Sequence, residues 1–271
     1  MCQFKSGIIL KNKVVLTPEG NESHSDLLES LGIEDTHMNA TKTFVRAELI
    51  PKNGNKCSDI SEWKYRVDQD IVPDWYEKDP GRYEQEFRDA VREYMKEYME
   101  KRNIVPICGY GWTAIKEDEK GTYYLMDGSL EKSEFGETNN YADSYIRKNL
   151  SEGDLAKELR AKFSDNLVPI ETNLLSLDGL DDYGKVEGDI LAIPTIDLYR
   201  ECRRKISNLG TWWWLSTPDS TPTGCGSDNV LYVYSDGSVG YDWCGGSRAV
   251  RPFFILKSSI FVSCDNAADS Q

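Results

Sequence analysis

The chain is poor in histidine and has no long apolar run. Its 271 residues include only two histidines, His24 and His37, both near the N-terminus. A zinc site built on several histidines, or a Ser-His-Asp triad, is therefore excluded from the second half. No apolar run approaches the roughly 20 residues of a membrane-spanning helix, and the N-terminal MCQFKSGIIL is too short for the apolar region of a signal peptide. We expect a protein without a membrane span, made in the cytoplasm, which is compatible with association with a virion.

Basic residues are a minority, and the cysteines have no metal-binding spacing. The 32 Lys and Arg residues face 46 Asp and Glu residues, which gives a formal net charge of -14. This charge argues against a nucleic-acid backbone as the main partner, because phosphate binding relies on clustered cations. The seven cysteines lack any CxxC pair, so neither a zinc ribbon nor a disulfide framework is indicated. We expect reduced thiols and no cofactor.

The first part of the chain, residues 1–103, is predicted to form a small α+β module. Two apolar runs on either side of Lys11-Asn12-Lys13 predict a hairpin over 7–16, and alternating apolar residues predict strands over 45–49 and 63–67. Ser23 or Ser25 can cap a short helix that Gly32 ends in the left-handed conformation. Asp79-Pro80 is typical of a helix start, and the apolar spacing that follows predicts a long amphipathic helix packed on the sheet.

The second part, residues 104–262, is predicted to form a separate domain. Paired strands are expected over 112–115 and 122–126, and helices over 141–150, 155–163 and 196–206. Residues 190–194 have the composition of a buried strand, and residues 177–188 that of an acidic loop. The polar tail, residues 263–271, is expected to be disordered.

The stretch Gly210–Leu256 is the most unusual part of the chain. It holds four of the seven tryptophans, three of them consecutive, around a centre rich in Ser, Gly, Asp and Tyr. Asp236-Gly237 predicts a tight turn between strands 231–234 and 239–241, with Tyr232 and Tyr234 on one face. Tyr, Ser, Gly and Asn dominate recognition surfaces, so this hairpin is either a binding surface or a hairpin with ordinary exposed tyrosines.

Several motifs in the second part resemble a known family. They are YADSYIRKNL, GDILAIPTIDLYRE, TWWWLSTP, VYSDGSV and RAVRPFFIL, in this order. They look like a domain of unknown function that is widespread in gut Firmicutes and their phages, with the pattern WWLRSP, VNSDGSV and GVRPA. That family is similar to the C-type-lectin-like and formylglycine-generating-enzyme-like fold. Its members resemble the variable proteins that diversity-generating retroelements mutate at adenines.

The resemblance implies a fixed framework and a set of variable positions. The framework would be Trp212, Trp213, Trp214, Leu215, Pro218, Ser235, Asp236, Gly237, Ser238, Val239, Val250, Arg251 and Pro252. The candidate ligand-binding positions would be Asp219, Ser220, Gly224, Cys225, Ser227, Asp228, Tyr232, Tyr234, Gly240, Tyr241, Asp242, Trp243, Cys244, Gly245, Gly246 and Ser247. Tyr, Asp, Ser, Gly and Cys are the residues that adenine-rich Asn codons become when only adenines change.

The chain departs from the family pattern at three positions. Ser216 stands for the usual Arg, Thr217 for Ser and Phe253 for Ala, so no role of that Arg can be transferred. The first part, with MCQFKSGI, SHSDLLESLGI and FVRAEL, resembles a module that precedes unrelated regions in phage proteins. That recurrence would imply a shared docking or regulatory part.

Three chemical alternatives stay open. Cys2, freed at the N-terminus, could act as nucleophile and base, with His24 and the acids Asp68, Asp70 and Asp74 as partners. Cys225 and Cys244 could support formylglycine-type oxidation, although both occupy positions that the resemblance makes variable. The acidic loop could bind Ca²⁺ or be a solvated loop, and its spacing fits no EF-hand.

The sequence as a whole favours a two-domain α+β protein of phage or prophage origin, with a C-type-lectin-like second domain. We expect this domain to bind a protein or another macromolecule, as a retroelement-diversified variable protein and without catalysing a reaction. No metal site is assigned. The alternative is an enzyme or anti-defence factor that uses Cys2 as nucleophile.

Overall fold

The computed structural model describes residues 5–17, 23–50 and 60–258. Helices and sheets both occur, so the expected α+β class is confirmed. The described residues up to Lys101 form one compact unit, and those from Arg102 onward form another. We call them the N-terminal unit and the C-terminal unit. Cys2 and the tail 263–271 lie outside the described residues.

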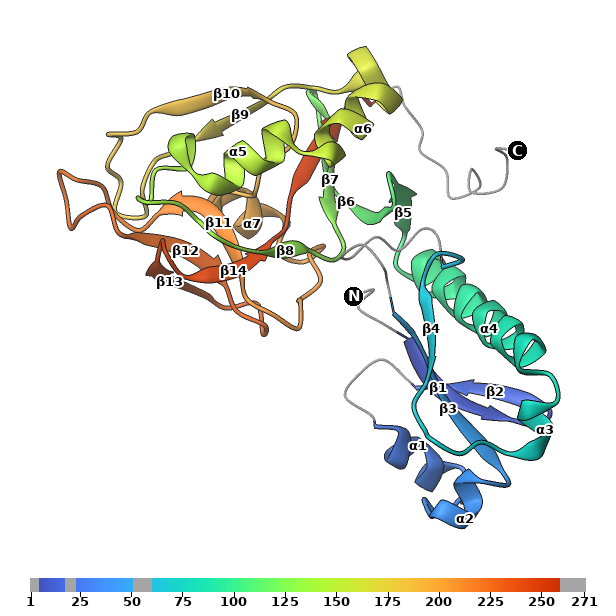
Figure 1. Cartoon of the computed structure of the whole chain (residues 1–271). Coiled ribbons are helices and arrows are strands. Elements are labelled where there is room, and N and C mark those ends of the chain that lie inside the picture. The colour runs from blue at the N-terminus through green and yellow to red at the C-terminus, as the bar shows by residue number, and fades with distance from the viewer. Residues whose placement is uncertain (1–4, 18–22, 51–59, 259–271) are drawn as a thin grey trace. The chain divides into compact units, whose positions relative to one another are not determined.

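The N-terminal unit is a four-stranded antiparallel sheet with helices on both faces (Figure 1). Its elements are β1 (Lys5–Leu10), β2 (Lys13–Leu16), α1 (His24–Ser30), α2 (His37–Ala40), β3 (Phe44–Ile50), β4 (Lys64–Val67), α3 (Asp74–Glu77) and α4 (Pro80–Lys101). The strand order is β2-β1-β3-β4. Because side chains alternate along a strand, β3 contributes to two cores. Val45, Ala47 and Leu49 pack with α4, whereas Phe44 packs with α1.

Local residue chemistry sets the helix ends of this unit as the sequence predicts. The Ser23 side chain accepts a hydrogen bond from the Asp26 N–H, and Asp26 accepts one from the Ser23 N–H, which completes a capping box. Gly32 follows α1 with a φ of +68°, a conformation that favours glycine. Asp79 accepts a hydrogen bond from the Arg82 N–H at the start of α4.

The C-terminal unit combines three sheets with three α-helices. Its strands are β5 (Ile104–Ile107), β6 (Tyr110–Asp118), β7 (Gly121–Met126), β8 (Leu130–Glu134), β9 (Ile170–Asn173), β10 (Lys185–Asp189), β11 (Trp213–Pro218), β12 (Asn229–Val233), β13 (Val239–Trp243), β14 (Ser247–Val250) and β15 (Phe253–Leu256). Its helices are η1 (Tyr141–Asp143), α5 (Tyr145–Glu152), α6 (Asp154–Phe163), η2 (Ser164–Asn166) and α7 (Ile196–Cys202).

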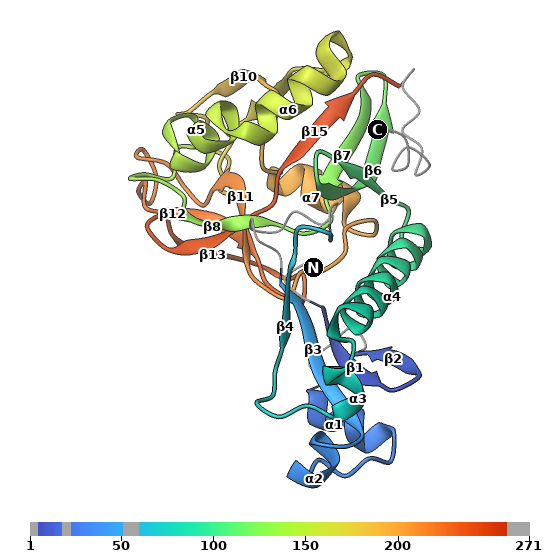
Figure 2. The same ribbon diagram turned by 45° about the vertical axis from the view of Figure 1, so that its right-hand side comes forward.

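The last strand of this unit pairs with one of its first. β15 lies antiparallel to β7 in the sheet β15-β7-β6-β5, as Figure 2 shows. The second sheet has the order β13-β12-β11-β14-β8, and the third consists of β9 and β10. One continuous apolar core joins all three, with Trp112 against Phe254 at a centroid distance of 4.7 Å. The pairing of β7 with β15 therefore joins the beginning of the unit to its end, and the chain between these two strands is enclosed by that pairing.

Several predicted elements differ in the structure. The helix predicted over 141–150 divides into η1 and α5 at Ser144, whose backbone is extended. Residues 190–194 are largely buried, but their backbone pairs with β15 only at the isolated bridge of Ala192 to Phe253, so they form no regular strand. The predicted acidic loop 177–188 ends in β10, which pairs with β9. The predicted helix 196–206 ends at Cys202 and continues as turns.

Candidate ligand-binding surface

The hairpin β12–β13 is held in place at its turn. Tyr234 and Ser238 are joined by a backbone hydrogen bond of 2.8 Å, and Gly237 has a φ of +85°. The Tyr199 hydroxyl donates to the Gly237 carbonyl at 2.6 Å, which ties the turn to α7. The Ser238 hydroxyl and N–H donate to Asp236 and keep the pKa of that carboxyl below its ordinary value. The turn thus lies at the expected residues, 235–238, and is braced from behind.

One face of the five-stranded sheet carries an aromatic cluster of Trp212, Trp214, Tyr232 and Tyr234. Trp212 stacks on Tyr232 with ring centroids 5.4 Å apart, and Tyr234 meets Trp212 edge-on at 4.9 Å. The Arg248 guanidinium lies over the Trp212 ring at 5.0 Å and pairs with Asp242. Arg248 is thus held by both the rings and a carboxylate, an arrangement that stabilises the cation.

Burial divides the cluster into a packed part and an open part. Tyr232 is 3% exposed, and burial raises the pKa of its phenol. Trp212 keeps 40% of its surface exposed. A Cβ at Gly240 would come within 2.8 Å of the Tyr234 ring, so glycine provides the space in which that ring lies. Trp212 is therefore the member of the cluster most available to another molecule.

The opposite face of β13 exposes a second set of apolar side chains, the edge-strand stripe of Val239, Tyr241 and Trp243. These residues alternate along an edge strand of the five-stranded sheet and are 40%, 60% and 62% exposed. The Trp243 ring lies against Gly245, where a Cβ would come within 2.6 Å of it. The missing side chain at Gly245 lets the ring rest on the turn, so Trp243 is presented in a defined position.

The loop between β11 and β12 is anchored at its base by buried Asn139. The Asn139 Nδ2 donates to the carbonyls of Ser220 and Asn229, each at 2.9 Å, and its Oδ1 accepts from the Tyr183 hydroxyl at 2.7 Å. The Asn139 N–H also donates to the Ser227 carbonyl at 2.7 Å. Both ends of the loop are therefore fixed, while residues 222–225 at its tip are exposed.

The acidic loop, residues 177–188, also holds the β11–β12 loop in place. Asp178 accepts from the Ser220 hydroxyl at 2.7 Å, and Asp182 accepts from the Thr223 hydroxyl at 2.7 Å and from the Thr223 N–H at 3.1 Å. Hydrogen bonds from Ser176 and Ser220 lower the pKa of Asp178, and those from Thr221 and Thr223 lower the pKa of Asp182. Both carboxylates therefore accept hydrogen bonds from the β11–β12 loop, which gives them a structural role.

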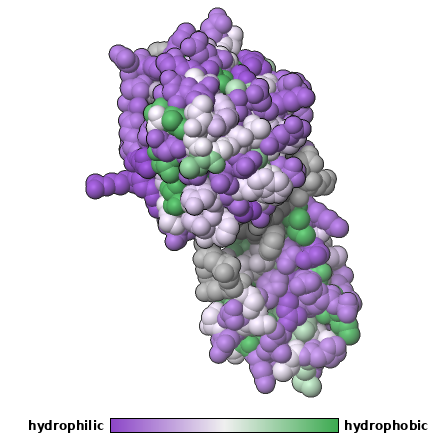
Figure 3. All heavy atoms as spheres, turned by 90° about the vertical axis from the view of Figure 1, so that its left-hand side faces the viewer, coloured by the Kyte–Doolittle hydropathy of each residue, from purple (hydrophilic) through white to green (hydrophobic). Residues whose placement is uncertain are grey.

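The two segments that hold most of the predicted ligand-binding positions, residues 219–228 and 240–247, meet in the structure. Asn229 is opposite Trp243 in the β12–β13 ladder, and the Cys244 N–H donates to the Asp228 carbonyl at 2.7 Å. Figure 3 faces the side of the C-terminal unit on which the β11–β12 loop lies, left in Figure 1. Pale and green surface of intermediate and high hydropathy lies there between purple hydrophilic regions.

The predicted ligand-binding residues fall into three groups by burial. The exposed ones are Gly224, Cys225, Asp228, Tyr241, Trp243 and Ser247, and the half-buried ones are Asp219, Ser227, Tyr234, Gly240, Asp242, Gly245 and Gly246. Ser220, Tyr232 and Cys244 are buried. These three need correction as contact positions, because their side chains are packed inside the unit. Burial raises the pKa of the Cys244 thiol, and Cys225 is an exposed free thiol.

Sequence reasoning assigned Trp212 to the framework and left Arg248 unassigned. Three consecutive residues of a strand alternate in direction, so Trp212 and Trp214 share a face opposite to that of Trp213. Alternation therefore groups Trp212 with Trp214, but it does not predict that Trp212 is 40% exposed while Trp214 is buried. The position of Arg248 depends on the pairing of β14 with β8 and β11, which the sequence alone does not reveal.

The residues proposed for an N-terminal nucleophile are placed only in part. Cys2 lies outside the described residues. His24 and Asp68 come together, with ligand atoms within 4.8 Å of each other, and Glu48 joins them. Glu48 was not anticipated, because its alternation in β3 marks it only as a polar strand residue.

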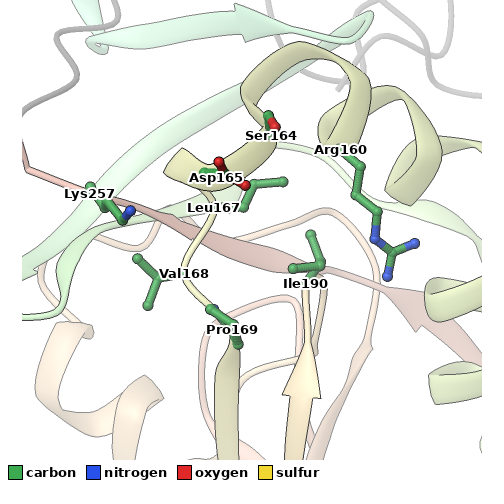
Figure 4. A pocket seen from close by; sticks show the side chains of 8 residues that line it. All are labelled: Arg160, Ser164, Asp165, Leu167, Val168, Pro169, Ile190 and Lys257. Carbon is green, nitrogen blue, oxygen red and sulfur yellow. The ribbon is translucent and has the colours of Figure 1, made fainter.

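One hollow of the C-terminal unit lies away from these loops. It has a volume of about 550 Å³ and is lined by residues around α6, η2 and the end of β15. Figure 4 shows Arg160 and Lys257 on opposite sides of it, with Asp165 between them. This hollow is wide open and contains none of the predicted site residues.

None of the described helices is both long and apolar enough to cross a bilayer. Comparison with protein-family models, with curated proteins and with solved structures finds no match. The functional interpretation therefore depends on the geometry of the chain itself.

Proposed function

We propose that the C-terminal unit is a C-type-lectin-like domain that binds a protein ligand through the edge-strand stripe and the tip of the β11–β12 loop. The proposal includes origin from a phage or prophage and diversification by a retroelement. The observation that carries it is the exposure of Tyr241 and Trp243, at 60% and 62%, on an edge strand beside that loop.

Physical arguments support a recognition role for this surface. Large aromatic side chains supply contact area at low entropic cost and are enriched where proteins bind one another. Here the Trp243 ring is already positioned on Gly245, and the adjoining loop is fixed at its base and exposed at its tip. Such pre-organisation reduces the entropy lost on binding.

The topology supports the proposed fold type. Pairing of β15 with β7 closes the unit, so changes in the loops between β11 and β14 leave its paired ends intact. A closed frame of this kind tolerates substitutions on one loop surface. The net charge of -14 favours a protein over a nucleic acid as the ligand.

Sequencing tests the diversification. Alleles of this gene should differ at the exposed positions Cys225, Asp228, Tyr241, Trp243 and Ser247, and should keep Tyr232 and Cys244. A near-copy of the segment that encodes Gly210–Leu256 and a reverse-transcriptase gene should lie nearby. Absence of both, or substitutions spread equally over buried positions, would remove the retroelement from the proposal.

A binding screen tests the recognition surface itself. Peptides selected from a random display library on the full chain should lose at least about tenfold in affinity for the double variant Tyr241→Ser, Trp243→Ser, because exposed aromatic anchors dominate such contacts. Ile71→Ser is a matched control, since Ile71 is 50% exposed in the N-terminal unit. Unchanged binding to the double variant would place recognition elsewhere on the chain.

A further inference from the structure

Three chemically reactive side chains from separate elements meet in the N-terminal unit. His24 is the first residue of α1, Glu48 lies in β3, and Asp68 follows β4. One ligand atom of each, an imidazole nitrogen or a carboxylate oxygen, lies within 4.8 Å of the others. Among the described residues, this is the only group of His, Cys, Asp or Glu that satisfies this spacing.

The fold positions the three side chains on one face of the sheet. In the β3–β4 ladder Glu48 is opposite Arg66, and the Asp68 N–H donates to the Arg46 carbonyl at 2.9 Å, which continues the pairing one residue beyond β4. Leu27 and Leu28 pack α1 onto this face, and its first turn therefore lies over Glu48.

One nitrogen of the His24 imidazole makes no hydrogen bond to the described residues. This atom, Nε2, is buried. A buried polar atom without a partner costs about 1–3 kcal/mol, so such an atom in a native site calls for an explanation, of which a bound ion is one. His24 as a whole is half-buried at the start of α1, so its ring lies within reach of solvent.

The carboxylates have different surroundings. Arg66 binds the Glu48 Oε2 at 2.6 Å and Arg46 pairs with Asp35, whereas Asp68 is exposed at the rim. Glu48 is therefore fixed through one oxygen and keeps the other for a second partner. The carboxylates of Asp35, Glu48 and Asp68 outnumber the guanidinium groups of Arg46 and Arg66. The excess negative charge favours a bound cation.

We propose that His24, Glu48 and Asp68 bind one divalent transition-metal ion, such as Zn²⁺, through one nitrogen and two carboxylate oxygens. Mixed imidazole and carboxylate donors suit Zn²⁺ and its neighbours in the first transition row. Three protein ligands leave room for water or another small ligand at the ion. This site is independent of the surface proposed for the C-terminal unit.

Titration of the full chain with Co²⁺, a spectroscopic substitute for Zn²⁺, tests the site. We expect one equivalent to bind, with visible d–d absorption and no thiolate-to-metal band in the near ultraviolet. A thiolate band would indicate that one or more of the seven cysteines bind the cobalt, so its absence is required for binding at His24, Glu48 and Asp68. Zn²⁺ should displace the cobalt and raise the melting temperature of the N-terminal unit.

Variants separate this site from any other. His24→Gln and Asp68→Asn should each weaken Co²⁺ binding by at least about tenfold, because each removes a ligand. His37→Gln is the matched control, since His37 is exposed on α2, and it should bind as the unchanged chain does. Far-UV circular dichroism checks that each variant is folded, and Asp68→Asn replaces an exposed residue.

Several results would overturn the proposal. They are no saturable cobalt binding to the unchanged chain, equal binding by folded His24→Gln and Asp68→Asn, or a thiolate band at the first equivalent. In the first case the three residues form only a cluster of a histidine and two carboxylates without an ion, and in the last the cysteines are the ligands.

Discussion

Two acidic regions of this chain look alike in composition and differ in what their oxygens do. In the C-terminal unit, Asp178 and Asp182 accept hydrogen bonds from Ser220 and Thr223 and so fasten a loop. In the N-terminal unit, a carboxylate oxygen of Glu48 and one of Asp68 lie within 4.8 Å of an imidazole nitrogen of His24, whose Nε2 has no hydrogen-bond partner among the described residues. The density of acids is therefore a poor guide to a binding site. Whether their ligand atoms are already occupied distinguishes the two regions.

The comparison predicts opposite responses to mutation. Residues that fasten the loop should contribute to stability, whereas residues of the proposed metal site should contribute little until an ion is bound. The predictions below test this contrast, beginning with the largest change.

Asn139→Ala should have the largest effect. The substitution removes the side-chain donor to the carbonyl of buried Ser220 and the acceptor of the Tyr183 hydroxyl, whereas the Asn229 carbonyl keeps the Asp219 N–H as a donor. We expect the free energy of unfolding of the C-terminal unit to fall by about 3 kcal/mol, since each unpaired buried group costs about 1–3 kcal/mol. Urea denaturation followed by tryptophan fluorescence measures it.

Asn140→Ala is the control for that change. Asn140 caps η1 by accepting from the Ala142 N–H at 3.0 Å, and loss of such a cap costs about 1 kcal/mol. If the Asn139 variant is no less stable than the Asn140 variant, the loop is not fastened as described.

Ser220→Ala should give the next largest effect. Its hydroxyl donates to Asp178 at 2.7 Å and accepts from the Cys225 N–H at 2.8 Å, and the side chain is buried. We expect a loss of about 1.5 kcal/mol, because a hydrogen bond to a charged group is among the stronger kinds. Amide exchange at Cys225 should quicken in parallel. An unchanged exchange rate there would show that the Ser220 hydroxyl does not hold this loop.

Local features of the fold could be predicted from sequence, since they depend on neighbours in the chain. Ser23 caps α1, Gly32 ends it with a positive φ, and Asp79-Pro80 begins α4. The hairpin turn at Asp236-Gly237 follows from the same kind of local preference.

Features that depend on distant partners could not be predicted. Alternation shows that Tyr232 and Leu231 face opposite sides, but not that both sides of β12 are covered. Residues 185–189 form a strand because β9 lies beside them, whereas residues 190–194 pair with β15 at a single bridge and form no strand. The meeting of His24 with Glu48 likewise requires α1 to pack on β3.

His24→Gln, measured without added metal, should change stability little. The replaced ring carries a nitrogen that makes no hydrogen bond among the described residues, so its loss removes an unfavourable feature along with some packing. We expect the free energy of unfolding of the N-terminal unit to change by less than about 0.5 kcal/mol. Thermal denaturation with a chelator present measures it. A loss close to that of Ser220→Ala would mean that His24 is structural and would erase the contrast between the two regions.

The smallest effect should be a local response of the acidic loop to pH. Hydrogen bonds from Thr221 and Thr223 lower the pKa of Asp182, so its contribution is present above the ordinary value of about 3.9 and is lost as pH falls through the lower folded value. Amide exchange at Thr223, whose N–H donates to Asp182, should therefore lose protection below about pH 4 after correction for the intrinsic rate. Asp182→Asn should remove this dependence, whereas the Leu177 N–H, which donates to the Pro218 carbonyl at 2.9 Å, should keep constant protection. Equal pH dependence at both amides would indicate that the whole unit loosens in acid and that Asp182 does not fasten the loop by itself.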